Sequence, residues 1–218
     1  NAEFEPFEFK DGDEVVGIDI EISQKIAEKL GVELEVSDIA FDTLITALQS
    51  GKADIVAAGM TADEDRKKNV DFSDPYFNAS QAIIVANDSD IVSRTDLNGK
   101  TVGVQLGTTG DKYCTNEDGE NDITVAEVKR YSKGMEAVSD LIAGRIDAVV
   151  IDNFPAEKLV EKNSDKVKKL DEALTSEEYA IAMPKGSTEL QKMVNEVLKE
   201  MQDSGEMDEI VGKYISAE

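Results

Sequence analysis

The feature that most constrains the fold is a short pattern that occurs once in each half of the chain. Residues 48–56 (LQSGKADIV) align with residues 141–149 (LIAGRIDAV), and each copy ends an amphipathic stretch with a glycine, a basic residue and an apolar run. A glycine after a helical stripe ends a helix, and a short apolar run is typical of a buried strand. The repeat therefore predicts two similar α/β lobes, which a chain of 218 residues can accommodate.

Segments of helical and of strand period alternate along the rest of the chain. Apolar stripes predict helices at residues 22–30, 44–48, 135–142, 190–201 and 210–214. Apolar or alternating runs predict strands at residues 32–36, 53–58, 82–86, 101–104, 123–128 and 146–151. This order favours mainly parallel sheets flanked by helices.

Composition excludes several classes of function. Lys and Arg total 23 against 47 Asp and Glu, a formal charge of −24 that repels nucleic-acid phosphates. Histidine is absent, which removes the commonest general base.

The single cysteine, Cys114, cannot form an internal disulfide, and we expect a buried structural thiol. No apolar run approaches the roughly 20 residues of a membrane helix, and the abrupt start at Asn1 predicts that an export signal or lipid anchor has been removed.

Polar residues follow the two predicted strands of the repeat, where open α/β sheets bind ligands. Thr61 and Glu64 have capping-box spacing, so we expect Thr61 to begin a helix that carries Arg66. Such a helix start with an arginine suits a carboxylate, although a surface arginine among charged neighbours explains the spacing equally well. Asp152 ends the second strand, either as a helix N-cap or as the partner of a cation.

Other candidate contacts are weaker as single motifs. Residues 107–110 (GTTG) form a small polar turn with two hydroxyls, Thr108 and Thr109, and they lack the Gly-Lys-Ser/Thr of a nucleotide-phosphate loop. Phe4 and Phe41 precede or begin predicted helices, where they either clamp a ligand or pack in the core.

Several segments taken together resemble the polar amino-acid-binding proteins of ABC importers, family 3 of the solute-binding proteins. The segments are residues 4–9, 17–22, 44–51, 59–66, 70–76, 99–110 and 182–187. The resemblance covers nearly the whole chain in the family's order. It implies a periplasmic-binding-protein clamshell with lobe 1 at residues 1–85 and 185–218, lobe 2 at residues 86–184, and hinge crossovers near residues 85–88 and 178–183.

The resemblance also implies roles for single residues. Arg66 would pair with the α-carboxylate of a free amino acid, helped by Thr61 and Thr109, and Asp152 would take the α-ammonium together with the Gly59 carbonyl. Phe4 and Phe41 would sandwich the ligand side chain. The protein would be a monomer without cofactor or catalysis, outside the cytoplasm in the periplasm or as a cell-surface lipoprotein, and it would deliver its ligand to the permease subunits of an ABC transporter.

Two positions depart from the pattern of relatives, and together with a third, neutral residue they suggest a neutral pocket. Asn1 stands where those relatives carry an aspartate, Ala58 stands where some carry a serine, and Gln105 is neutral. We therefore expect an amino acid with an uncharged side chain, although Glu3 or Asn153 could still reach the cleft. Relatives also carry one more strand before the position of Asn1, and leaving it out would remove ladder partners from its neighbours. The alternatives are a ligand-sensing domain of a membrane receptor and an enzyme resembling cyclohexadienyl dehydratase.

Overall fold

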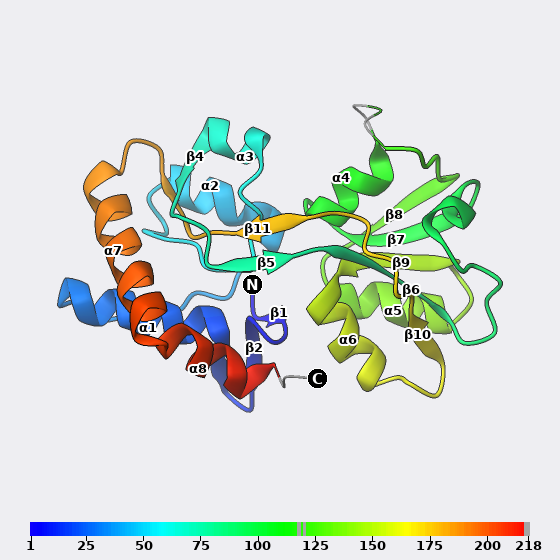
Figure 1. Cartoon of the computed structure of the whole chain (residues 1–218). Helices are drawn as coiled ribbons and strands as arrows, with labels where there is room; N and C mark the ends of the chain where they lie inside the picture. Colours follow the sequence, from blue (N-terminus) through cyan, green and yellow to red (C-terminus); the bar gives the residue numbers. More distant parts are fainter. Residues whose placement is uncertain (117–118, 120, 216–218) are drawn as a thin grey trace. The chain divides into compact units, whose positions relative to one another are not determined.

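The computed structural model describes residues 1–116, 119 and 121–215, and the chain divides into two compact units (Figure 1). Residues 1–78 with 177–218 form lobe 1, and residues 79–176 form lobe 2. These boundaries come earlier in the chain than the predicted ones after residues 85 and 184. The reason is pairing, because residues 81–86 form a strand within the sheet of lobe 2 and residues 182–184 pair with a strand of lobe 1.

Lobe 2 is built on a sheet of strand order β10-β6-β9-β7-β8. Its strands are β6 (Gln81–Ala86), β7 (Thr101–Gln105), β8 (Glu127–Tyr131), β9 (Ala148–Asp152) and β10 (Val167–Lys169). Its helices are η2 (Arg94–Leu97), α4 (Thr109–Thr115), α5 (Gly134–Ile142) and α6 (Asn153–Glu161). β7 runs parallel to β8 and β9, as expected for helix–strand repeats, whereas β6 runs antiparallel to β9 and β10.

The core of lobe 2 consists of apolar side chains from the central strands, with Cys114 of α4 among them. Cys114 is only 2% exposed, which confirms the prediction of a buried thiol. Burial raises the pKa of this thiol to about 12. The thiol is therefore protonated at neutral pH and serves as a small apolar side chain.

Lobe 1 contains short antiparallel pairs and longer helices. Its strands are β1 (Glu3–Phe4), β2 (Glu8–Asp11), β3 (Glu14–Val16), β4 (Val70–Phe72) and β12 (Ala182–Pro184). Its helices are α1 (Ile18–Leu30), η1 (Phe41–Thr43), α2 (Leu44–Gln49), α3 (Glu64–Asn69), α7 (Thr188–Ser204) and α8 (Glu206–Tyr214). Where the chain passes between the lobes, β5 (Phe77–Ala79) pairs with β11 (Glu177–Tyr179). Among the described helices of both lobes, none is long and apolar enough to cross a membrane.

Two predicted strands of lobe 1 do not form. Residues 32–36 are in no strand, and Val32 and Val36 are 60% and 43% exposed. Residues 53–58 make only an isolated bridge, between Val56 and Ala182. The local pattern is that of a strand at both places, but a strand also needs a neighbour that takes its backbone hydrogen bonds. Within the described residues no ladder pairs with either segment.

The predicted strand at 123–128 begins later than expected, at Glu127. Ile123 is fully buried in the core of lobe 2, but the backbone before β8 bonds to the turn that precedes β7. In that connection Thr124 accepts from Gly99 at 2.9 Å, and Ala126 donates to Lys100 at 2.8 Å. The apolar pattern therefore identified a buried segment but misplaced the start of the ladder.

Candidate functional site

Arg66 is held in the first turn of α3, close to Thr61. The helix is capped by Asp63, whose carboxylate accepts from the backbone N–H of Arg66 at 2.7 Å, so the predicted cap at Thr61 is wrong. The Thr61 hydroxyl donates instead to Glu177 at 2.5 Å, because β11 runs beside this segment. The Thr61 carbonyl accepts from Nη1 of Arg66 at 2.8 Å, which brings the two predicted residues together.

The guanidinium of Arg66 is buried against an aromatic face. Arg66 is 5% exposed, and its guanidinium carbon lies 5.5 Å from the centroid of the Phe41 ring. Phe41 begins η1 and packs in the apolar core of lobe 1 together with Ala58. Nε of Arg66 is 3.6 Å from the Asp63 carboxylate, a distance too long for a strong ion pair. Lobe 1 thus holds an oriented cation in a mainly apolar setting.

Gly59 is packed directly against Phe4. Its φ is +51°, and a Cβ at this position would lie 2.8 Å from the Phe4 ring, so only glycine fits. Phe4 is 4% exposed and lies in β1, not at a helix start as predicted. The centroid of the Phe4 ring lies 6.3 Å from that of the Phe7 ring.

The carboxylate of Asp19 holds the backbone of Gly59 in place. No sequence motif pointed to Asp19 as a site residue. Its carboxylate accepts from the Gly59 N–H at 2.8 Å and from the Tyr76 hydroxyl at 2.7 Å. Burial raises the pKa of Asp19 from 3.8 to about 6, although both hydrogen bonds act in the opposite direction. A sequence signal existed, because Asp19 lies on the same helical face as the buried Ile22 and Ile26.

Asn1 lies beside the segment that leads into Phe41. Its side-chain amide donates to the Ile39 carbonyl at 3.3 Å, and the next residue, Ala2, donates to Asp38 at 2.8 Å. Lobe 1 therefore brings Arg66 to Phe41, Gly59 to Phe4, and Asn1 to the segment before Phe41, in each case from segments that are distant in sequence.

In lobe 2, the predicted turn at residues 107–110 begins α4. The Thr108 hydroxyl accepts from the Asp111 N–H at 3.3 Å and donates to the Gln105 carbonyl at 2.8 Å, so Thr108 caps the helix. Gln105 ends β7 and is 3% exposed. Thr109 is half-buried at the first helical position.

Asp152 ends β9, the strand next to β7 in the sheet. It occupies the N-cap position of α6, but its side chain makes no capping hydrogen bond. Asp152 is only 4% exposed. The following residue, Asn153, accepts from Lys169 at 2.6 Å and donates to Glu157 at 2.9 Å. Because β7 and β9 are parallel, Gln105 and Asp152 lie at the same carboxyl edge, where such sheets bind ligands.

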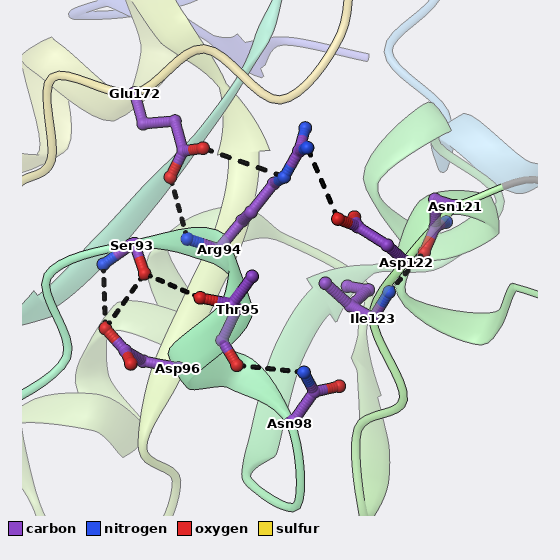
Figure 2. A network of polar contacts seen from close by, with 9 residues as sticks. All are labelled: Ser93, Arg94, Thr95, Asp96, Asn98, Asn121, Asp122, Ile123 and Glu172. Carbon is purple, nitrogen blue, oxygen red and sulfur yellow. Dashed lines mark hydrogen bonds and ion pairs between the residues drawn. The ribbon is translucent and has the colours of Figure 1, made fainter.

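A cavity of about 490 Å³ opens beside Thr109 in lobe 2, and Arg94, Lys112, Tyr113 and Asp122 are among the residues lining it. Figure 2 shows Arg94 extending between Glu172 and Asp122. Its Nε lies 3.7 Å from Glu172, its Nη2 lies 3.3 Å from Asp122, and its backbone N–H donates to Glu172 at 2.7 Å. Two carboxylates already balance the cation, so Arg94 serves mainly to fix the wall of this cavity. Among the described residues, no group of three or more acidic, cysteine or histidine side chains could hold a metal ion.

The comparisons with known proteins identify the family of the chain. The family model for bacterial extracellular solute-binding proteins, family 3, matches residues 1–217. The chain belongs to this family. A relative from Bacillus subtilis, the arginine-binding extracellular protein ArtP, is 40% identical over 100% of this chain and 85% of its own length. The ABC transporter glutamine-binding protein GlnH of the same species is 35% identical over 93% of this chain and 73% of its own.

Solved structures of family-3 binding proteins share the fold. An ancestral arginine-binding protein bound to glutamine has a TM-score of 0.90 and 45% identity, and the match covers 99% of this chain and 95% of that one. The two-lobed α/β fold expected from the resemblance is therefore confirmed. The relatives named here bind amino acids, and GlnH is named as a protein of an ABC transporter.

Proposed function

We propose that the protein grips the two poles of one amino acid with Arg66 from lobe 1 and Asp152 from lobe 2. The observation that carries this proposal is that lobe 1 holds a buried arginine, Arg66 at 5% exposure, and that lobe 2 holds a buried aspartate, Asp152 at 4%, at the carboxyl edge of its sheet. The carboxylate of a zwitterion can pair with the guanidinium of Arg66, and its ammonium group can pair with the carboxylate of Asp152. A ligand that contacts both lobes stabilises a closed state of the hinge.

The remaining predicted residues would complete the grip. Thr61 and the turn at Thr108 and Thr109 would assist Arg66 at the α-carboxylate, and the Gly59 carbonyl would accept from the α-ammonium. Phe4 and Phe41 would enclose the ligand side chain. The buried contacts of Gly59 with Phe4 and of Arg66 with Phe41 support these roles, because they hold the four residues in fixed orientations.

We further propose that the ligand side chain is uncharged. The support is that Asn1, Ala58 and Gln105, which we expect to face the ligand, carry no charge. The solved relative bound to glutamine is compatible with a neutral ligand. Arginine is the second candidate, because the relative ArtP is named as an arginine-binding protein.

Calorimetry with L-glutamine and L-arginine separates the two ligands. We expect tighter binding of glutamine, and a ligand at 100 times its dissociation constant should raise the free energy of unfolding by about 2.7 kcal/mol. Binding of arginine more tightly than glutamine would overturn the uncharged preference but leave amino-acid binding intact. A thermal-shift screen of the remaining amino acids extends the same test.

The variants Arg66→Ala and Asp152→Ala test the two charges. Each should weaken ligand binding by about 2–5 kcal/mol, as expected when one partner of a buried charge pair is removed. This corresponds to roughly 30-fold to several-thousand-fold in the dissociation constant. Arg145→Ala is the matched control, since Arg145 of lobe 2 is exposed, is paired with Asp140 at 2.9 Å and is not among the proposed ligand contacts, so its loss should leave affinity unchanged. Wild-type affinity in both test variants would show that the site is assigned wrongly.

We also propose that the protein acts outside the cytoplasm as a monomer. It would pass its ligand, chemically unchanged, to the permease of an ABC importer. The name of the extracellular relative supports this location. Light scattering on the purified protein tests the monomer, and incubation of the ligand with the protein followed by mass spectrometry tests the absence of a chemical step.

A further inference from the structure

Gln81 opens β6 and carries a buried amide without a partner. The residue is 0% exposed, and among the described residues neither its Oε1 nor its Nε2 forms a hydrogen bond. Its backbone is well held, because its N–H donates to the Thr175 hydroxyl at 2.8 Å and its carbonyl accepts from Leu174 at 2.9 Å. An unsatisfied buried amide is less favourable than an apolar side chain of the same shape. We therefore expect the Gln81 amide to form a hydrogen bond in another state of the protein, such as the ligand-bound state.

Two neighbours show where that partner lies. Gln81 pairs in register with Asp152 across β6 and β9, so both side chains project from the same face of the sheet. Oε1 of Gln81 lies 2.8 Å from the position that a Cβ would take at Gly110, in the first turn of α4. The amide thus occupies the space that Gly110 leaves open, adjacent to Thr109 and opposite Asp152.

We propose that Gln81 is a positioning residue that orients Asp152 in the ligand-bound protein. Its Nε2 would donate to one oxygen of the Asp152 carboxylate while the other oxygen accepts from the α-ammonium of the amino acid. The inference rests on the proposed function, because it takes Asp152 as the partner of that ammonium.

The chemistry favours an amide at this position. A carboxylate accepts several hydrogen bonds, so Asp152 can accept from Gln81 and from the ligand ammonium at the same time. A lysine or arginine at position 81 would neutralise the charge that the ligand ammonium requires. A neutral N–H donor orients Asp152 and leaves its charge available to the ligand.

The variant Gln81→Met removes the amide at similar volume. We expect the melting temperature of the ligand-free protein to stay the same or rise, because an unsatisfied group is lost. Affinity for the tighter-binding probe of L-glutamine and L-arginine should fall about tenfold or more. Unchanged affinity in the folded variant would overturn the inference.

Gln191→Met is the matched control with the opposite expected pattern. Nε2 of Gln191 donates to the Phe72 carbonyl in lobe 1 at 2.6 Å, so this amide is satisfied in the ligand-free protein. Its replacement should lower the melting temperature and leave affinity unchanged. A purely structural role for Gln81 would make the two variants behave alike.

Gly110→Ala provides a second test if Gln81→Met does not fold. The added methyl group would meet the Gln81 amide at 2.8 Å and the Val150 carbonyl at 3.0 Å. The Val150 contact is the same in both backgrounds, so a larger fall in affinity in the wild-type background than in a Gln81→Leu background would report the displaced amide. Equal losses in both backgrounds would overturn the inference. If Asp152→Ala loses binding and Gln81→Met binds normally, this inference is refuted and the proposed function stands. If the wild-type protein binds neither probe nor any other amino acid, the proposed function itself is refuted.

Discussion

The two copies of the repeated pattern adopt different structures in the two lobes. Both copies end a helix at a glycine with nearly the same φ, 69° at Gly51 and 68° at Gly144. After Gly144 the chain enters β9, which pairs with β6 on one side and β7 on the other. After Gly51 the chain makes only the bridge between Val56 and Ala182. Similar local sequence therefore fixes the helix end but not the strand.

The difference lies in what surrounds each copy. In lobe 2, Asp147 donates its backbone N–H to Thr101 at 2.9 Å and accepts from the Thr101 N–H at 2.7 Å, which aligns β9 with β7. The equivalent residue in lobe 1, Asp54, is exposed like Asp147, but among the described residues no ladder includes the segment that follows it. A strand is a property of at least two segments, and the second copy has partners on both sides.

Amide hydrogen exchange should show the largest difference between the copies. The amides of Val149 and Val150 in β9 should exchange only through global unfolding, at least about 10⁴-fold more slowly than free amides. Those of Ile55 and Ala57, which flank the isolated bridge, should exchange through local opening at rates much closer to free ones. Nuclear magnetic resonance on the ligand-free protein measures each amide separately.

The amide of Val56 is an internal control for that experiment. It donates to the Ala182 carbonyl at 2.8 Å and should be slower than its two neighbours. Protection across residues 53–58 equal to that of β9 would mean that the first copy also forms a ladder. The contrast between the lobes would then disappear.

Sequence reasoning succeeded where the determinant is local. Helix stripes and their terminal glycines placed α1, α5 and α7 well, and the turn at residues 107–110 begins a helix as predicted. Errors arose where a distant segment decides the outcome. Thr61 does not cap α3 because its hydroxyl bonds to Glu177, which is remote in sequence.

The same limit applies to the candidate site. Arg66 and Asp152 could be found from motifs and family resemblance, whereas the helical pattern indicates only that Asp19 is buried, and no motif singles out Gln81. Their importance depends on partners across helices and strands, namely Gly59 and Tyr76 for Asp19 and the register with Asp152 for Gln81. No spacing along the chain encodes such contacts.

The two lobes also differ in how they hold a buried carboxylate, and this difference should appear in the pH dependence of the free energy of unfolding. The expected effect is smaller than that on hydrogen exchange. Asp111 in lobe 2 is paired with Arg130 at 2.9 Å, but Asp19 in lobe 1 has two neutral donors and a pKa raised to about 6. A carboxyl whose folded pKa lies above its unfolded value stabilises the protein at low pH, and this contribution is lost as the pH rises through about 6. The loss should amount to on the order of 3 kcal/mol between pH 4 and pH 7.

Asp19→Asn isolates this contribution from the titration of other groups. An asparagine can still accept from Gly59 and bond to Tyr76, but it does not titrate. Urea unfolding of both proteins across this range should show the stability of the wild type falling relative to the variant as pH rises. A constant difference would mean that Asp19 does not gain a proton in this window.

The smallest expected effect comes from the two repeat glycines, where the lobes should agree. At both positions a Cβ would meet nothing within 4 Å, so the cost of a side chain is that of the left-handed backbone alone. Gly51→Ala and Gly144→Ala should each lower the free energy of unfolding by about 1 kcal/mol, and the asparagine variants by less, since asparagine tolerates this conformation. Urea unfolding of the four variants measures these costs. A much larger cost at Gly144 than at Gly51 would show that the strand after Gly144 depends on the turn at this glycine. The helix end and the following strand would then form together, and the repeat could not fix one without the other.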